Sequence, residues 1–272
     1  MPDFAAAVAD SLSPDARAER FRRIAEEAIS ERHIRGSNGF GTLREKRLHA
    51  AVKRYLCEDA RFHEVKVAGT RYLADVCIGQ SLFEVQTGNL YPLFRKIAAY
   101  LEDPDRTVTV VRPLAVNRTL CWIDPENGTV TPPRKVGYHS RPAQLLSDLY
   151  PLRTLLRNPR LRVRLLLLEV VDFRLLNGWS GDRKRGAERY ERVPTGLIDD
   201  RTFSRPDEYL DLFPDGLPER FPVRSFSGAI RLPRRDADRA VRTLEALGLV
   251  CPTGKEGRAT LWSRTGTPTT MS

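Results

Sequence analysis

Two acids and an amide, placed around a short turn, form the pattern with the clearest chemical meaning in this sequence. Asp75 belongs to one β-rich segment, and Glu84 and Gln86 belong to the next. Gly79 and Gln80 separate the segments, and glycine at the first of two central positions is typical of a type II′ hairpin turn. The register set by such a turn predicts that Asp75 lies opposite Glu84, with Cβ atoms about 5 Å apart.

Like charges that face each other across a ladder destabilise a sheet, so this pair favours a bound cation or a shared proton. Gln86 follows Glu84 by two residues and is expected on the same face, because side chains alternate along a strand. The alternate positions form an apolar face that suits a core: Ala74, Val76, Phe83 and Val85. The other interpretation is a solvated polar face that carries no site.

A helix expected from about residue 43 to 56 precedes this hairpin. Its residues Glu45, His49 and Lys53 are spaced by four and cover an arc of about 80° beside the apolar stripe. A helix that lies beside the sheet would bring these side chains to the acid pair. Each residue also has a structural interpretation: Thr42 and Glu45 fit a capping box, and the other two fit boundary or solvated positions.

The order helix, three strands, helix, strand over residues 42–114, together with Glu45, Asp75 and Glu84-x-Gln86, resembles the PD-(D/E)XK nuclease superfamily. The closest likeness is to the branch in which glutamine replaces the last lysine. The fold that this implies is α/β, a restriction-endonuclease-like mixed sheet flanked by helices. The sequence is also similar to an uncharacterised bacterial family that adds a C-terminal winged helix-turn-helix domain.

The resemblance implies hydrolysis of DNA phosphodiester bonds with Mg²⁺ (or Mn²⁺) as cofactor. Asp75 and Glu84 would be the metal ligands, and Glu45 would orient an outer-shell water. The expected catalytic set is completed by three further side chains: Gln86, His49 and Lys53. Because Gln86 carries no charge, we expect Lys53 or Lys96 to supply the cation that the motif lysine provides elsewhere in the superfamily.

The C-terminal segment has the order of a winged helix-turn-helix. Helices are expected at residues 224–230 and 235–247, and strands at 249–251 and 259–263. Arginines near the start of the second helix would read guanine edges, and a basic wing would contact phosphates. The expected DNA-binding residues are Arg234, Arg235, Arg239, Arg242, Lys255 and Arg258. A winged helix used for protein contact or dimerisation is the alternative.

Composition agrees with a polyanionic partner, since the 272 residues carry a formal net charge of +10. The four cysteines form no CxxC pair, no secretory signal is present, and no apolar run is long enough to span a membrane. We therefore expect a cytoplasmic protein that binds DNA and no membrane, with a homodimer left open. The expected parts are a helical segment (1–37), the nuclease-like domain (38–176), a linker (177–206) and the winged helix (207–267).

Three functions remain after the sequence is considered alone. A metal-dependent DNA nuclease anchored by its winged helix is preferred, because all four motif residues are present together. A nuclease fold that binds or regulates DNA without turnover is second, and an RNA nuclease or protein adaptor is third. Of the other polar residues, Glu169 and Asp172 are expected at strand ends or exposed edges, and His63 and Glu64 in pairing roles at a sheet end.

Overall fold

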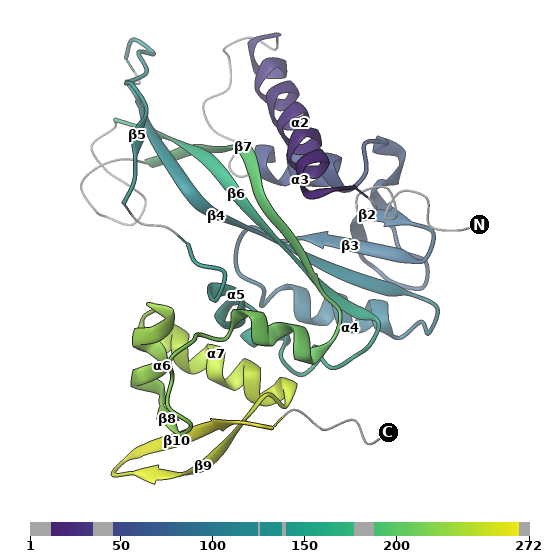
Figure 1. Cartoon of the computed structure of the whole chain (residues 1–272). Coiled ribbons are helices and arrows are strands. Elements are labelled where there is room, and N and C mark those ends of the chain that lie inside the picture. Colours follow the sequence, from purple (N-terminus) through teal and green to yellow (C-terminus); the bar gives the residue numbers. More distant parts are fainter. Residues whose placement is uncertain (1–11, 35–45, 125, 138–139, 177–187, 267–272) are drawn as a thin grey trace. The chain divides into compact units, whose positions relative to one another are not determined.

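The structure is a computed structural model that describes residues 12–34, 46–124, 126–137, 140–176 and 188–266, and it shows an α/β fold with two sheets (Figure 1). The larger sheet is mixed and has seven strands, in the order β1-β2-β3-β4-β6-β7, with β5 paired to β4. The smaller sheet has three strands in the order β8-β10-β9. The expected mixed sheet flanked by helices is therefore confirmed at the level of architecture.

The first three strands, β1 (His63–Lys66), β2 (Leu73–Ile78) and β3 (Ser81–Val85), form an antiparallel meander. The register of the β2–β3 hairpin is the predicted one, with Ile78 opposite Ser81 and Val76 opposite Phe83. Gly79 has a φ of 59°, which the first central position of a type II′ turn requires.

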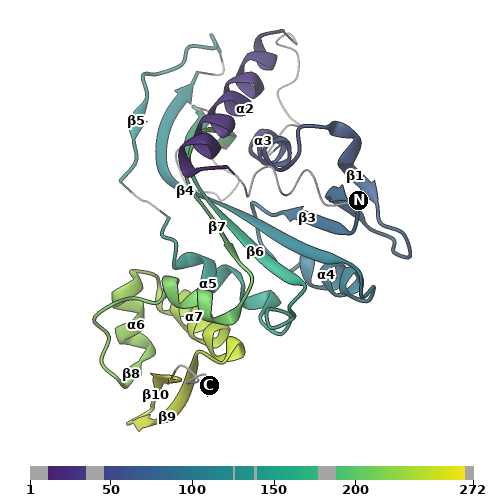
Figure 2. The same ribbon diagram turned by 45° about the vertical axis from the view of Figure 1, so that its right-hand side comes forward.

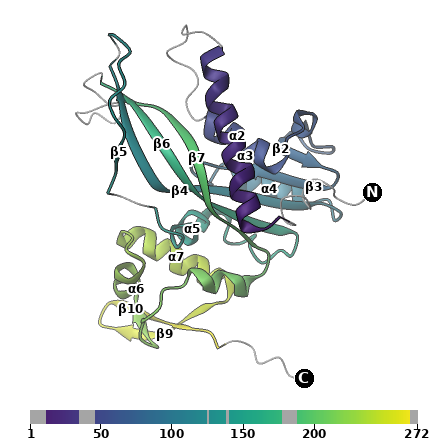
Figure 3. The same ribbon diagram turned by 45° about the horizontal axis from the view of Figure 1, so that its top comes forward.

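Long strands complete the sheet, and β4, β6 and β7 run beside one another (Figure 3). The strand expected to end at about residue 114 continues without a break to Ile123 as β4. The linker expected at residues 177–206 is wrong for most of its length, since residues 188–203 form the last strand of the sheet. Residues 177–187 of that linker lie outside the described residues. The bounds are β4 (Thr107–Ile123), β5 (Arg134–Lys135), β6 (Leu161–Leu175) and β7 (Glu188–Phe203).

Helices α2 (Pro14–Ile34) and α3 (Lys46–Leu56) lie side by side over this sheet (Figures 1 and 2). Their apolar residues enter one core with β2, β3, β4, β6 and β7. Phe21 of α2 packs edge to face on Tyr55 of α3, with ring centroids 5.3 Å apart. The first helix is thus part of this core and not a segment separate from it.

The chain divides into two compact units that alternate along the sequence. One contains Met1–Thr87, Val111–Ser140 and Leu165–Arg201, and the other contains Gly88–Val110, Arg141–Arg164 and Thr202–Ser272. We call the second the C-terminal unit. Among the described residues, every helix is too short or too polar to cross a membrane.

In the C-terminal unit, α6 (Val223–Ile230) and α7 (Arg234–Leu247) are followed by β9 (Val250–Glu256) and β10 (Ala259–Arg264). Strand β8 (Phe221–Pro222) pairs with β10. The loop expected between the last two strands is shorter than predicted, because β9 continues to Glu256. The remaining elements are α4 (Leu93–Leu101), α5 (Gln144–Asp148), and the 3₁₀ helices η1 (Ala60–Phe62), η2 (Tyr150–Leu152) and η3 (Pro206–Leu212).

Candidate active site

Three acids occupy neighbouring positions on the first three strands of the large sheet. Val76 and Phe83 are the last paired residues of β2 and β3. Asp75 and Glu84 are the next residues on these two strands. Glu64 lies on β1 between two residues that pair with the neighbours of Asp75. The hairpin turn and the antiparallel meander therefore place Glu64, Asp75 and Glu84 in a row.

Asp75 is held by contacts with a helix and with the adjoining strand. His49 of α3 approaches it with Nε2 3.2 Å from Oδ1, and the backbone N–H of Val85 donates to Oδ2 at 2.8 Å. The meeting of His49 with Asp75 was expected from helix spacing. The bond from Val85 was not, because a side chain that binds the main chain of the next strand has no signature in sequence.

Glu84 is a buried carboxylate with only 2% of its surface exposed. The interpretation of a solvated polar face is therefore wrong at this position, since every residue of β3 from Leu82 to Val85 is buried. Burial of a carboxylate is unfavourable unless hydrogen bonds or a cation compensate for its charge. Glu84 is therefore a buried acid that needs compensation, and it follows Phe83, the last residue of β3 in register with β2.

Lys53 and Glu64 form an ion pair at the edge of the site, with Nζ 2.8 Å from Oε1. The hydrogen bond and the charge of Lys53 lower the pKa of Glu64, while the nearby charge of Asp75 opposes that shift. Glu64 has a φ of 53°, which is uncommon for a residue other than glycine. The ion pair with Lys53 agrees with the pairing role that was expected for Glu64, and backbone outliers of this kind are often found at functional sites.

Gln86 follows the end of β3 and is fixed by its backbone. Its N–H donates to the carbonyl of Val111 at 3.0 Å, and its own carbonyl accepts from Nη1 of Arg112 at 2.8 Å. Arg112 is buried within an apolar run of β4 and was missed by the sequence analysis. A charged arginine inside an apolar run is the sequence signal that could have identified it. Of the two expected substitutes for the motif lysine, Lys53 pairs with Glu64, and Lys96 lies with Nζ 5.9 Å from the ring of Tyr100 in the C-terminal unit.

The donor chemistry of Asp75 and Glu84 suits a hard divalent cation. Mg²⁺ prefers carboxylate oxygens and water, and it often takes only one or two carboxylates from the protein. Oδ1 of Asp75 contacts His49 and Oδ2 accepts from the Val85 N–H, and an ionised carboxylate can accept more than two hydrogen bonds or metal bonds in all. Within the described residues, no three His, Cys, Asp or Glu side chains assemble as a metal-binding group. Glu45, the further acid expected here, lies outside the described residues.

Of the six basic residues expected to bind DNA, four line one cavity of the C-terminal unit and two lie elsewhere in that unit. Arg239 lies 6.0 Å from the ring of Tyr150 and 3.9 Å from Asp236, and Lys255 is exposed on β9. The other four border one cavity: Arg234, Arg235, Arg242 and Arg258. The sequence thus predicted a basic surface, and the structure collects only part of it around a single concavity.

Comparison with protein families identifies residues 46–204 with a domain of unknown function, DUF8091. The chain belongs to this family. No curated protein and no solved structure matches the chain. The matched DUF8091 region begins with α3 and ends with β7, so it contains His49, Lys53, Asp75, Glu84 and Gln86. The DUF8091 match ends before α6, α7 and the small sheet.

Proposed function

We propose that this DUF8091 protein is a metal-dependent nuclease that hydrolyses DNA phosphodiester bonds on a PD-(D/E)XK-type fold. The observation that supports this most directly is the meeting of Asp75 with His49 of α3 next to the buried Glu84. The spacing of the three residues along the chain favours the same grouping. The order α3, β1, β2, β3, α4, β4 agrees with the common core of the superfamily.

Asp75 and Glu84 are the residues that would hold Mg²⁺ or Mn²⁺, and Glu45 is proposed to complete the site. The bound ion supplies Lewis-acid polarisation of the scissile phosphate and lowers the pKa of an attacking water. The protein orients these groups itself. The Val85 N–H and His49 hold the two oxygens of Asp75, Lys53 pairs with Glu64, and Arg112 donates to the Gln86 carbonyl. Gln86 is proposed to orient the attacking water through its side-chain amide.

The purified chain with Mg²⁺ or Mn²⁺ should cut at least one form in a panel of linear, nicked, branched and single-stranded DNA. Gel analysis of end-labelled substrates measures this, with EDTA as the control that should stop cleavage. A panel of RNA substrates, run in parallel, tests whether the chain is instead an RNA nuclease. If every substrate stays intact with both metals, the nuclease proposal fails and the non-catalytic DNA-binding function replaces it.

One observation favours the alternative function, a nuclease fold that binds or regulates DNA without cleaving it. Both oxygens of Asp75 already have protein partners, His49 and the Val85 N–H, so the acid is satisfied without a metal. Under this alternative the carboxylates serve the stability of the hairpin. DNA binding that does not depend on divalent metal, in the absence of any cleavage, would support it.

The C-terminal unit is proposed to anchor DNA as a winged helix. Helices α6 and α7 are joined by a turn at Arg231, and β9 and β10, which follow the helix pair, form a small sheet with β8, which precedes it. Apolar residues of α7 are buried at the predicted positions, which leaves its basic residues on the outer side of the helix. This arrangement supports the proposal, and the basic residues give it an electrostatic basis.

Duplex DNA should bind to the full chain with an affinity that falls steeply as salt rises, because each neutralised phosphate releases counterions. Measurements use Asp75→Asn in EDTA, so that cleavage does not interfere. Arg235→Gln and Lys255→Gln should each reduce the slope of log affinity against log salt by about one unit. Arg157→Gln is the control, since Arg157 is exposed in the same unit and is not among the expected DNA-binding residues, and it should leave the slope unchanged. A chain that binds no duplex at roughly 0.05 M salt would assign this unit to protein docking.

A further inference from the structure

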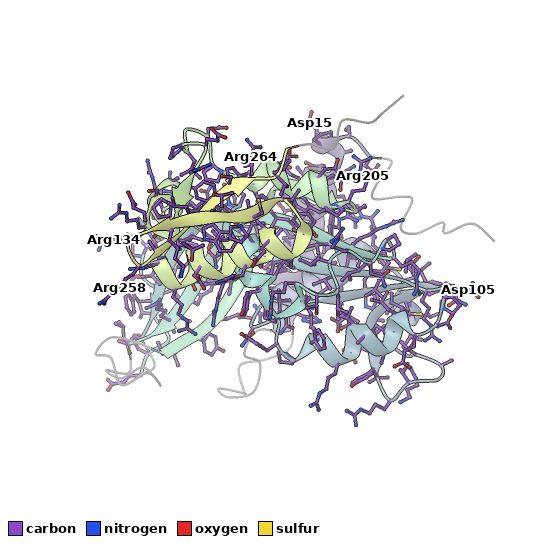
Figure 4. The ribbon with its side chains drawn as sticks, turned by 90° about the horizontal axis from the view of Figure 1, so that it is seen from below. Asp15, Asp105, Arg134, Arg205, Arg258 and Arg264 are labelled. Atoms are coloured by element: carbon purple, nitrogen blue, oxygen red, sulfur yellow. The ribbon has the colours of Figure 1, made fainter. Side chains whose placement is uncertain are left out.

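The C-terminal unit contains a cavity of about 470 Å³ that is lined by an unusual concentration of arginine. We call it the arginine cavity. It lies where the starts of α6 and α7 meet the start of β10, and Figure 4 shows Arg258 projecting at the tip of the β9–β10 hairpin. Its charged lining residues are Arg224, Arg234, Arg235, Arg242, Arg258 and Asp238.

Acidic neighbours balance only part of this charge. Arg224 pairs with Glu256 at 3.2 Å, and Arg242 pairs with Glu245 at 3.0 Å. The other three arginines, Arg234, Arg235 and Arg258, form no ion pair with any described residue. With Asp238 as the one acid in the lining, the cavity keeps an excess of positive charge and therefore favours an anion.

The backbone adds to the same preference. Helix α6 begins after Pro222 and α7 begins after Pro233, and neither proline provides a side-chain cap. The first residues of both helices line the cavity. Unpaired N–H groups and the helix dipole give each N-terminus a partial positive charge that stabilises anions, phosphate in particular.

Trp262 provides an independent sign that a ligand belongs here. The residue lines the cavity and is 1% exposed, and its indole Nε1–H has no hydrogen-bond acceptor among the described residues. The guanidinium of Arg242 lies 5.0 Å from the indole ring. A buried donor without an acceptor costs about 1–3 kcal/mol, and an anion that draws Nε1 toward the cavity would remove that cost.

We propose that the arginine cavity binds a phosphate monoester, the terminal phosphate of a nucleotide or of a nucleic-acid strand. A monoester carries about two charges near neutral pH, whereas a backbone diester carries one, and several guanidinium groups suit the higher charge. A concave site also accepts a strand end more readily than the middle of a duplex. Phosphate binding in the arginine cavity does not depend on the proposed cleavage at Asp75 and Glu84, because it requires neither a metal nor turnover.

The test compares oligonucleotides that differ only in their 5′ end. Fluorescence anisotropy with the full chain in EDTA should show at least tenfold tighter binding of a 5′-phosphorylated single strand than of its 5′-hydroxyl form. The double substitution Arg234→Gln and Arg258→Gln should abolish this preference. Arg157→Gln with Arg220→Gln removes the same charge from exposed positions of this unit that do not line the cavity, and it should keep the preference.

Competition with adenosine 5′-monophosphate and adenosine separates the two sources of phosphate. If adenosine 5′-monophosphate displaces the oligonucleotide and adenosine does not, the ligand is a free nucleotide. If neither compound displaces the oligonucleotide, the ligand is the phosphorylated end of a strand. Equal binding of the two oligonucleotides, or a preference that persists in the folded cavity variant, overturns the proposal. Should the double variant fail to fold, Arg258→Gln at the exposed turn replaces it and should reduce the preference at least threefold.

A second readout follows the indole itself. The chain has three tryptophans, and inorganic phosphate should shift one ¹⁵N-indole resonance, which Trp262→Phe removes. This shift should be absent from the cavity variant and present in the control variant. A phosphate titration that leaves all indole resonances in place would contradict an anion bound at Trp262.

Discussion

Asp75→Asn and Glu84→Gln should each lower the rate of DNA cleavage by about 10³-fold or more while the fold is retained. This loss corresponds to about 4 kcal/mol of transition-state stabilisation, the size expected when a metal ligand is weakened. The amides keep the shape of the side chains, so the amide oxygen that Asp75→Asn introduces could still accept the hydrogen bond from the Val85 N–H. Cleavage rates at saturating Mg²⁺ measure the effect.

A matched control comes from Asp15→Asn, which makes the same charge change at an exposed position in the first turn of α2 (Figure 4). It should cleave at the parent rate. Circular dichroism and urea denaturation establish that the variants are folded. Cleavage that persists within tenfold of the parent in both acid variants would exclude the proposed metal ligands.

The contacts of Asp75 also change the stability that we expect for the variant Asp75→Ala. From sequence alone, removal of one of two facing acids relieves repulsion and leaves the protein as stable as before, or more so. In the structure, Asp75→Ala would instead remove the contact with His49 and the bond from Val85. We therefore expect a loss of about 1–3 kcal/mol in the free energy of unfolding, since the buried N–H is left unpaired.

Features that depend on local chemistry were the ones the sequence predicted. The register of β2 with β3 follows from Gly79, because a two-residue turn fixes which residues pair. Helix α7 follows from the spacing of its apolar residues, and its end follows from Gly248, which has a φ of 80°. These signals lie within a few residues of the elements that they determine.

Features that depend on partners far away in the chain were missed. Strand β7 has no simple alternation of apolar and polar residues, and its place beside β6 comes from long-range pairing. The left-handed backbone of Glu64 is unexpected for its residue type, and its pairing with Lys53 depends on the packing of α3. Arg112 likewise reaches the end of β3 only because β4 pairs beside it.

Asp172 is the clearest error of the sequence analysis, because it is fully buried and not at an exposed edge. It accepts hydrogen bonds from Arg118 of β4, 54 residues away, and from Arg192 of β7, 20 residues away. Its Oδ1 lies 2.6 Å from Nε of Arg192. Glu169 of the same strand is exposed, as expected, and accepts from Asn117. One buried carboxylate thus links three adjacent strands.

Asp172→Asn should lower the free energy of unfolding by about 3–5 kcal/mol, because it leaves two largely buried guanidinium groups without their counter-charge. Urea denaturation of the two proteins measures this. Glu169→Gln makes the same change at the exposed position on β6 and should cost less than about 1 kcal/mol. Replacement of the whole group, as Asp172→Leu with Arg118→Met and Arg192→Met, should recover much of the loss, since no buried charge then lacks a partner.

The same comparison has a defined pH dependence. Burial alone raises the pKa of Asp172, but the hydrogen bonds and charges of Arg192 and Arg118 outweigh burial, so its pKa lies below the ordinary value of 3.8. A carboxyl with a lowered pKa in the folded state stabilises the fold above its unfolded pKa and loses that contribution as pH falls through the folded pKa. The stability gap between the parent and Asp172→Asn should therefore be constant near neutral pH and narrow below about pH 4. A gap that is small at pH 7, or that widens on acidification, would show that Asp172 is not the charged centre of these three strands.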